Sequence, residues 1–321
     1  MSKTAIILFF ILFASCNKLV DSKGEFNEII IIVSNEDRNS VEEPINQLLS
    51  EYVNTPIEEP LYKLKWIEPE NFTRYLDFSN LFFISLDSPS DSTIDLLVDK
   101  FIYEYDKDIF LLNDIYANNQ HLIFFQCDSL LDFQVKIKKY GNWITDSFEE
   151  NIKNNILKYL EQFNRDRELE ELIYSIYKKN IRIQEDYLLI KQDELNNFIW
   201  IGRGYPYRWL TFMAFEDFVE LDEIWNKYEE MLNQNMPNVN ISEYYKNILF
   251  DSDNSIKIQG LYEEEISETG GPFFSYIFYS ESLEKMIAIS GFVNNPGKPK
   301  NRLLRELETI VEEIKSEDNY E

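Results

Sequence analysis

A long stretch of helical periodicity near the middle of the sequence divides the chain into two halves. From Asp146 to Lys179, apolar side chains recur every three or four positions. The stripe consists of Phe148, Ile152, Ile156, Leu160 and Phe163, followed by Leu169, Leu172, Ile173 and Ile176. This spacing places the apolar residues on one side of a helix. As one helix or two, the stretch would reach up to about 50 Å at 1.5 Å per residue. We therefore expect two halves joined by a long helical segment.

The first half, residues 27–180, has the pattern of an α/β arrangement that includes the connecting helix. Ile29–Val33 is continuously apolar, and Leu81–Leu86 is apolar apart from Ser85, which is typical of strands covered on both faces. Leu61–Ile67 alternates between apolar and charged residues, so we expect a half-exposed strand near a sheet edge. The other elements expected here are strands at Ile109–Ile115 and Leu122–Phe125, and helices at Ile94–Phe101 and from a capping box at Ser40–Glu43.

The second half, residues 181–316, alternates strands and helices with short turns and ends in an acidic tail at residues 317–321. The expected strands are Tyr187–Lys191, Phe198–Ile201, Tyr207–Phe215, Ser255–Tyr262, Phe273–Tyr279 and Lys285–Val293. The expected helices are Leu221–Leu232 and Asn301–Lys315, each with apolar residues at helical spacing. The whole pattern predicts an α+β fold with mixed or antiparallel sheets flanked by helices.

The chain carries a strong negative charge, because 31 Lys and Arg residues stand against 58 Asp and Glu residues. The formal net charge of −27 repels nucleic acids and anionic bilayers, so we expect no nucleic-acid partner. The charges are interspersed among apolar residues, which predicts a solvated acidic surface on a folded chain rather than a disordered tail.

Met1–Cys16 has the parts of a secretory signal. Lys3 gives a positive start, Ala5–Phe13 is an unbroken apolar run, and Ala14-Ser15 supplies the small residues that precede a cleavage site. The apolar run is far shorter than the roughly 20 residues that span a bilayer. We therefore expect residues 1–15 to be removed as a signal peptide.

Cys16, directly after the small pair, makes this segment resemble the lipobox of bacterial lipoproteins, although Phe13 stands where Leu is commoner. The resemblance implies cleavage before Cys16, lipid on its sulfur and new amino group, and a polar tether over residues 16–26. The alternative is a plain secretory signal with a chance cysteine. Asn17 is not the Asp associated with inner-membrane retention, so the resemblance implies a periplasm-facing protein anchored by lipid to the outer membrane.

Several short pieces of the sequence resemble a family of uncharacterised bacterial envelope lipoproteins, classed only as a domain of unknown function. The sharpest piece is the Gly-Gly-Pro-Phe of Gly270–Phe273, although Thr269 stands where Met is usual and Tyr262 where Trp is usual. The other pieces are Glu59-Pro60-Leu61, Asn80–Leu86, Phe198-Ile199-Trp200, Gly260-Leu261-Tyr262, and Gly291-Phe292-Val293 with Pro296 and Arg305. The resemblance covers nearly the whole mature chain and implies a location and a fold, but no activity and no site residue.

The residues that usually carry catalysis or bind metals are scarce. His121 is the single histidine, which excludes His-rich zinc sites. Cys127 lies six residues further along an expected strand, roughly 20 Å away at 3.3 Å per residue, too far for a Cys–His pair. We expect no catalytic, cofactor-binding or metal-binding residue and no cofactor. If Cys16 were free of lipid, a Cys16–Cys127 disulfide would be the alternative.

Four other motifs have structural explanations that we favour over functional ones. Asp251–Ser255 lacks the Gly and Glu of a calcium loop, and Gly202-Arg203-Gly204 lacks the helix of a dinucleotide site. Gly270-Gly271-Pro272, followed by Phe273, is expected to form a tight turn rather than an anion-binding nest. The aromatic concentration is expected to be core rather than a stacking platform for sugars or peptides; it comprises Trp200, Tyr205, Tyr207, Trp209, Phe212, Phe215 and Phe218.

A group of four cations stands out in so acidic a chain: Lys298, Lys300, Arg302 and Arg305. They fall at the start of the last expected helix, where the helix dipole disfavours positive charge. A compensating partner is therefore expected, either the protein's own glutamates or a lipid headgroup or acidic partner protein.

These observations predict a lipid-anchored envelope protein that acts as a non-enzymatic binding or assembly module, with an envelope protein or glycan as partner. The alternative is a carboxylate-dependent hydrolase of envelope glycans, because acidic residues are abundant and their separation in space cannot be read from the sequence.

Overall fold

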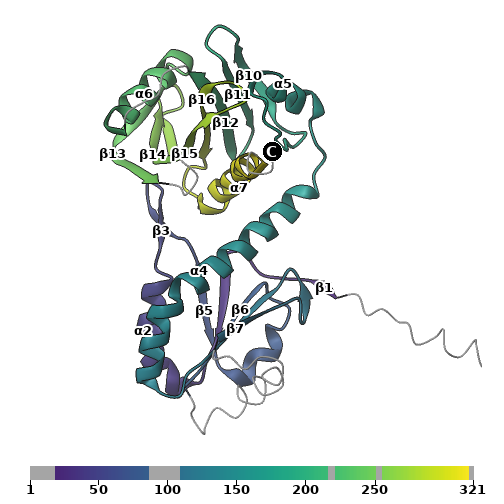
Figure 1. Ribbon diagram of the computed structural model, residues 1–321, viewed down its shortest axis with the longest axis vertical. Helices are drawn as coiled ribbons and strands as arrows, with labels where there is room; N and C mark the ends of the chain where they lie inside the picture. The colour runs from purple at the N-terminus through teal and green to yellow at the C-terminus, as the bar shows by residue number, and fades with distance from the viewer. Residues whose placement is uncertain (1–18, 87–108, 216–220, 251–254, 318–321) are drawn as a thin grey trace, which may run out of the picture. The chain divides into compact units, whose positions relative to one another are not determined.

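The structure is a computed structural model that describes residues 19–86, 109–215, 221–250 and 255–317 (Figure 1). The chain forms two compact units. Unit one comprises residues 1–49 and 62–154, and unit two comprises residues 50–61 and 155–321. The 32-residue helix α4, Leu130–Glu161, starts in unit one and ends in unit two. The α+β class and the long helix between two halves are therefore confirmed.

Unit one is built on a five-stranded sheet with strand order β5-β2-β6-β9-β7. Its strands are β2 (Glu28–Ile32), β5 (Lys63–Ile67), β6 (Asn80–Ser85), β7 (Ile109–Asn113) and β9 (His121–Gln126). The first four strands in this order run parallel, and β7 runs antiparallel to β9. The pattern of Leu61–Ile67 correctly indicated an edge strand, because β5 is the outer member of the sheet. A short pair, β1 (Val20–Asp21) with β8 (Ala117–Asn118), lies apart from this sheet.

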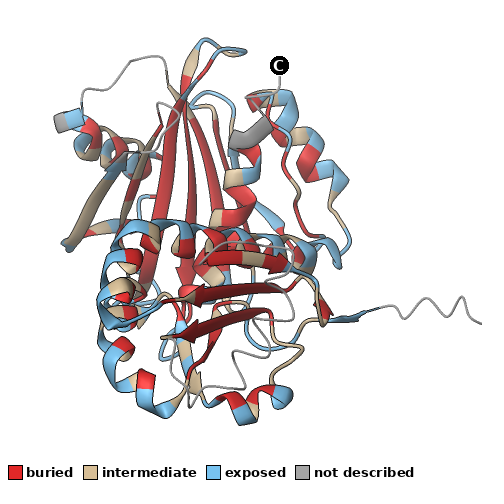
Figure 2. Ribbon diagram, turned by 60° about the horizontal axis from the view of Figure 1, so that its bottom comes forward, coloured by how far each residue is buried: buried red, intermediate tan, exposed pale blue. Residues whose placement is uncertain are grey.

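Both faces of the unit-one sheet are covered. On one face, the 3-10 helix η2 (Pro69–Arg74) brings Phe72 against Phe83, with ring centroids 5.0 Å apart. On the other face, α4 packs Phe148 against Phe82 at 5.8 Å, and α2 (Asn35–Leu48) buries Val41 and Ile45. This two-sided cover explains why Ile29–Ile32 of β2 and Leu81–Ile84 of β6 are continuously apolar in sequence (Figure 2).

Unit two is built on a seven-stranded antiparallel sheet with strand order β10-β11-β12-β16-β15-β14-β13. Its strands are β10 (Leu188–Asp193), β11 (Phe198–Arg203), β12 (Tyr207–Phe215), β13 (Val239–Phe250), β14 (Ile256–Glu264), β15 (Thr269–Ser280) and β16 (Lys285–Asn294). A small hairpin of β3 (Tyr52–Asn54) and β4 (Glu58–Pro60) also belongs to this unit.

Three helices accompany the unit-two sheet: α5 (Arg167–Tyr177), α6 (Ile224–Asn235, after the 3-10 turn η3, Leu221–Glu223) and α7 (Asn301–Glu317). Tyr228 of α6 stacks on Phe273 of β15 with centroids 5.7 Å apart, within the core that also holds Phe292. Glycine at position 291 leaves room for its neighbours, because a β-carbon there would lie 2.5 Å from the Phe274 ring of β15 and 3.1 Å from Leu307 of α7. Leu210 and Phe212 are fully buried, so the strand at the centre of the aromatic concentration is core, while Tyr205 and Tyr207 are exposed.

Some element boundaries differ from the predictions. The first helix starts at Asn35 rather than at the capping box, because the extended residue Ser34 caps it and Ser40 lies inside it. The central helix starts at Leu130, well before Asp146, and is followed by α5 as a second helix. The expected helix at Ile94–Phe101, Phe218 and most of Asp251–Ser255 lie outside the described residues.

Strand β13 was not predicted. It forms one edge of the sheet, and its pairing with β14 shifts register between Ile241 and Lys246. That irregularity interrupts the alternation of apolar and polar side chains by which a strand is recognised in a sequence.

Candidate functional site

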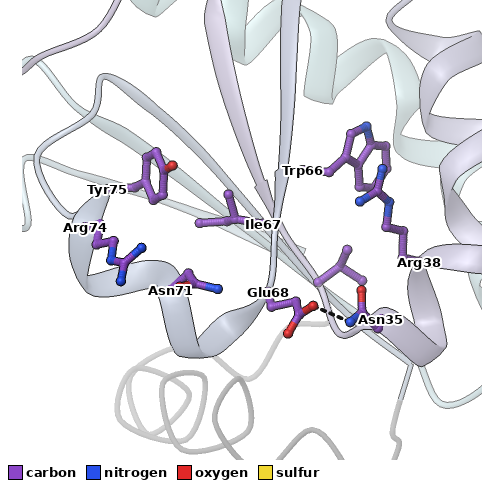
Figure 3. Close-up of a pocket in the computed structure, with 9 residues that line it drawn as sticks. Asn35, Arg38, Trp66, Ile67, Glu68, Asn71, Arg74 and Tyr75 are labelled. Atoms are coloured by element: carbon purple, nitrogen blue, oxygen red, sulfur yellow. Dashed lines mark hydrogen bonds between the residues drawn. The ribbon is translucent and has the colours of Figure 1, made fainter.

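A pocket of about 320 Å³ opens in unit one beside the carboxyl ends of the parallel strands β2 and β5 (Figure 3). It is lined by Val33, Asn35, Arg38, Trp66, Ile67, Glu68, Asn71, Arg74 and Tyr75. Val33 directly follows β2, Ile67 ends β5, and most of the polar residues come from α2 and η2. Ligands of open α/β sheets bind at this edge, because loops and helix starts gather there.

The start of α2 supplies one wall of the pocket. The Ser34 Oγ accepts a hydrogen bond from the Asp37 amide at 3.1 Å, which caps the helix and sets the positive end of its dipole beside the pocket. Asn35 Nδ2 donates to the Glu68 carboxylate, as the dashed line in Figure 3 shows. This contact ties the start of the helix to the end of β5 and engages the single carboxylate among the lining residues.

Arg38 and Trp66 form a second wall, where the guanidinium carbon lies 5.2 Å from the centre of the indole ring. Arg38 also makes a forked ion pair with Glu42, with Nε donating to Oε2 at 3.0 Å and Nη2 donating to Oε1 at 2.9 Å. Hydrogen bonding from Arg38 lowers the pKa of Glu42, and the same contact raises the pKa of Arg38. The guanidinium is thereby held in a fixed position beside the ring.

The third wall comes from η2, whose Asn71 and Arg74 lie on the side of Ile67 away from Arg38, together with Tyr75 (Figure 3). The Lys65 Nζ lies 4.8 Å from the centre of the Tyr75 ring, which adds a further positive charge near the pocket. Arg74 is exposed and makes no ion pair with any described residue of the chain. Its charge is therefore available to a ligand.

This arrangement can accept a small anion. Arg74 and the helix start offer donors and positive potential, since the charge of Arg38 is paired with Glu42, and the two aromatic rings offer flat apolar surface. The lining residues include no Ser, Cys or His that could form a nucleophile–base pair. Among the described residues, no group of three or more His, Cys, Asp or Glu side chains could hold a metal ion.

The two residues considered for catalysis in the sequence are both buried. The ring of His121 is buried, with Nδ1 3.0 Å from the Ser147 carbonyl oxygen. Burial lowers the pKa of His121, against the opposing effects of the Ser147 carbonyl, Glu150 and Asp114. Cys127 is buried directly after β9. The pocket of Figure 3 contains neither residue.

The expected tight turn at Gly270–Phe273 is wrong, because all four residues lie within β15 and pair with β14 from Gly260 to Glu263. The turn lies just before β15, at residues 265–268, where the backbone φ of Glu268 is positive, at 52°. The two glycines are needed instead because neighbouring strands approach them closely. A β-carbon added at Gly270 would collide with the carbonyl oxygen of Tyr262, and one added at Gly271 would collide with the carbonyl oxygen of Val293.

The four cations have contacts within unit two. Lys300 and Arg305 are each only 8% exposed, and Arg302 Nε donates to Glu306 at 3.1 Å. Lys298 is exposed, with its Nζ 5.6 Å from the centre of the Tyr205 ring.

Sequence reasoning missed the residue that compensates the start of α7. The Glu59 carboxylate accepts from the Lys300 amide at 2.8 and 2.9 Å and from the Asn301 amide at 2.9 Å.

Sequence reasoning also missed the pocket residues Arg38, Trp66 and Arg74. One signal was present: Ser34 and Asn35 directly follow a fully apolar strand, which marks a strand end leading into a helix start.

Cys16 lies outside the described residues. Within the described ranges, no helix is both long and apolar enough to cross a bilayer.

Comparison with known families matches most of the chain in two parts. Residues 22–161 match the family model described as domain of unknown function DUF8532, and residues 166–313 match domain of unknown function DUF4837. The two matches meet between α4 and α5. They fit the expected uncharacterised family and assign no activity.

Comparison with curated proteins gives no match. Similar solved structures include a point mutant of the protein Mog1, at 9% identity and a TM-score of 0.28, covering 42% of this chain and 87% of that one. They also include LpqN of Mycobacterium tuberculosis, described as involved in cell envelope biogenesis, at 8% identity and a TM-score of 0.27. That match covers 42% of this chain and 79% of LpqN. Likenesses this weak carry no functional argument.

Proposed function

We propose that this protein is a lipid-anchored binding module of the bacterial cell envelope, and that the pocket of Figure 3 binds a small anionic ligand carried by an envelope protein or glycan partner. The anchor is Cys16, on the strength of the short apolar run and the small residues before it. The protein faces the periplasm from the outer membrane.

One observation carries the binding role. Arg74, which has no ion-pair partner among the described residues, and the start of α2 line one hollow beside the paired Arg38, in a chain whose formal net charge is −27. Positive groups gathered in a concave site of an acidic protein give a local potential opposite to that of the surrounding surface. Such a site selects anions that the rest of the protein repels.

Titration calorimetry with inorganic pyrophosphate as the probe tests this role. The wild-type chain is expected to bind it, with an affinity that falls as salt rises. Arg74→Gln should weaken binding by at least about tenfold, since a charge-assisted hydrogen bond contributes roughly 1.5–3 kcal/mol. Arg167→Gln is the matched control, because the Arg167 side chain is 67% exposed and belongs to unit two. Equal affinities of the wild type and Arg74→Gln would contradict the role.

The second candidate function is hydrolysis of envelope glycans by paired carboxylates, and one cavity in unit two favours it. A hollow of about 920 Å³ there is lined by Glu263, Glu264, Glu265 and Glu268. Two of the four already have partners: Glu264 accepts from the Ser267 amide at 3.2 Å, and Glu265 accepts from Asn240 Nδ2 at 2.8 Å. Release of reducing sugar from peptidoglycan, abolished in Glu263→Gln and Glu268→Gln variants, would establish this function over the binding role.

A further inference from the structure

A second pocket, within unit two, is small and largely apolar. It encloses about 220 Å³ between the end of α4, the segment 180–184 and α7. Leu157, Leu160, Ile181 and Ile310 supply its apolar wall, and all four belong to the same compact unit. Three of these side chains are at most 7% exposed, whereas Glu161 and Glu313 on the same lining are exposed, so the pocket has a buried apolar wall and an open side. Its polar lining includes Gln184 and Arg182.

Gln184 has a hydrogen-bond donor without an acceptor. The residue is 4% exposed, and its Oε1 accepts from Arg203 Nη1. A guanidinium can only donate, so the oxygen of the amide must face Arg203 and the nitrogen must face away. Nε2 is buried and has no hydrogen-bond partner. Leaving a buried donor unpaired costs free energy, so an acceptor from outside the chain is expected at this position.

Arg182, two residues earlier on the same segment, presents a second such donor. Its Nη2 donates to the carbonyl oxygens of Glu161 at 3.0 Å and Phe163 at 3.2 Å, while its Nε is buried without a partner. Among the described residues, no carboxylate pairs with Arg182. Arg165, also on the lining, differs because a forked ion pair at 2.7 Å to Glu170 uses its charge.

From these contacts we propose that the pocket binds a small aliphatic monocarboxylate. The hydrocarbon chain lies against the four apolar side chains, and the carboxylate accepts from Gln184 Nε2 and Arg182 Nε. Glu161 and Glu313 lie on the lining but are exposed, where water screens their repulsion. The inference concerns a second site and goes beyond the proposed role of the unit-one pocket.

The test is titration calorimetry of the full-length protein with hexanoate and with hexylammonium. The two probes share a hydrocarbon chain and differ in the sign of the head group, so only hexanoate is expected to bind. Gln184→Glu keeps an oxygen facing Arg203 and replaces the free donor by a negatively charged acceptor. This variant should bind hexanoate at least about tenfold more weakly. Gln192→Glu, the same change at an exposed position of β10, is the matched control and should bind like the wild type.

Thermal unfolding of each variant shows whether it is folded. If Gln184→Glu does not fold, Ile181→Trp, which fills the hollow, takes its place and should abolish binding. Equal binding of both probes would overturn the proposal, because the pocket would then recognise only hydrocarbon. Absence of hexanoate binding at millimolar concentration would also overturn it and would leave water as the partner of the two donors. Full binding by the folded Gln184→Glu variant would exclude Gln184 as the recognising residue.

Discussion

At the scale of single residues, polar side chains in unit one fix how α4 meets the sheet. Asn151 of α4 donates to Asn80 Oδ1 at 2.8 Å and to the Ser79 carbonyl at 3.0 Å, and all of these groups are buried. Ser147, one turn earlier, offers its carbonyl to His121. The sequence did not reveal this partner of His121, because a helix–sheet contact joins residues that are distant in sequence.

The buried histidine makes stability depend on pH. Because burial lowers the pKa of His121 in the folded state from 6.5, the unfolded chain takes up a proton first as pH falls. The free energy of unfolding should therefore decrease as pH falls below about 6.5, by up to roughly 1.4 kcal/mol per pH unit. Most carboxylates titrate below this window.

Urea unfolding at pH 7.5, 6.5 and 5.5 measures the effect. His121→Gln should be less dependent on pH than the wild type over this range, since the variant has no histidine left. Identical pH dependence in the two proteins would show that His121 does not stay neutral in the folded state.

At the scale of elements, the start of α7 is completed by a distant part of the chain. The Glu59 carboxylate accepts hydrogen bonds from the backbone amides of Lys300 and Asn301. The Asn301 Nδ2 in turn donates to the Pro60 carbonyl at 2.8 Å. This carboxylate supplies the negative charge that a helix start favours, where the sequence itself places cations. The hairpin of β3 and β4 thereby becomes part of unit two.

We expect Glu59→Ala to lower the free energy of unfolding by about 1–2 kcal/mol, the usual cost of losing a helix cap. Glu58→Ala, at the exposed neighbouring position, removes the same charge without a capping contact and should leave stability nearly unchanged. Denaturant unfolding compares the two variants. Equal losses would attribute the effect to net charge rather than to the cap.

The glycines of β15 are the second element-scale case. A β-carbon at Gly271 would collide with the Val293 carbonyl, whereas one at Gly204 would meet only Tyr207 at 3.9 Å. Gly271→Ala is expected to destabilise the protein by about 1–3 kcal/mol through this overpacking, and Gly204→Ala should be close to neutral. Thermal unfolding of the pair tests the difference. If Gly271→Ala left the stability unchanged, β15 and β16 would have to move apart at this position without a loss of stability.

Strands and helices were predicted correctly from the sequence where the spacing of apolar residues stayed regular over the whole element. Tyr207–Phe215 was placed with its observed bounds, and α7 was placed with the observed start. β13 was missed because a register shift broke its alternation, and the Gly270–Phe273 turn was misplaced because glycine marks close approach as well as turns. The pocket of Figure 3 depends on strand pairing between residues far apart in sequence, which local patterns do not contain.

At the scale of the whole molecule, the chain combines two units, each with its own sheet and core. The two family matches divide the sequence near the end of α4. The cation-lined pocket in unit one and the donor-lined pocket in unit two both offer positive groups in an acidic chain. The binding role that we propose requires a fixed location where the protein meets its partner, and the proposed anchor at Cys16 would provide one.

Mass spectrometry of the N-terminal peptide, from protein isolated out of native membranes, tests that location directly. We predict that residues 1–15 are absent and that the peptide begins at Cys16 with acyl groups on its sulfur and its amino group. Cys16→Ser should lose the acyl groups and no longer remain with the membrane after a high-salt wash. An N-terminal peptide that retains Met1, or an unmodified Cys16 in membrane-bound protein, would contradict the proposal.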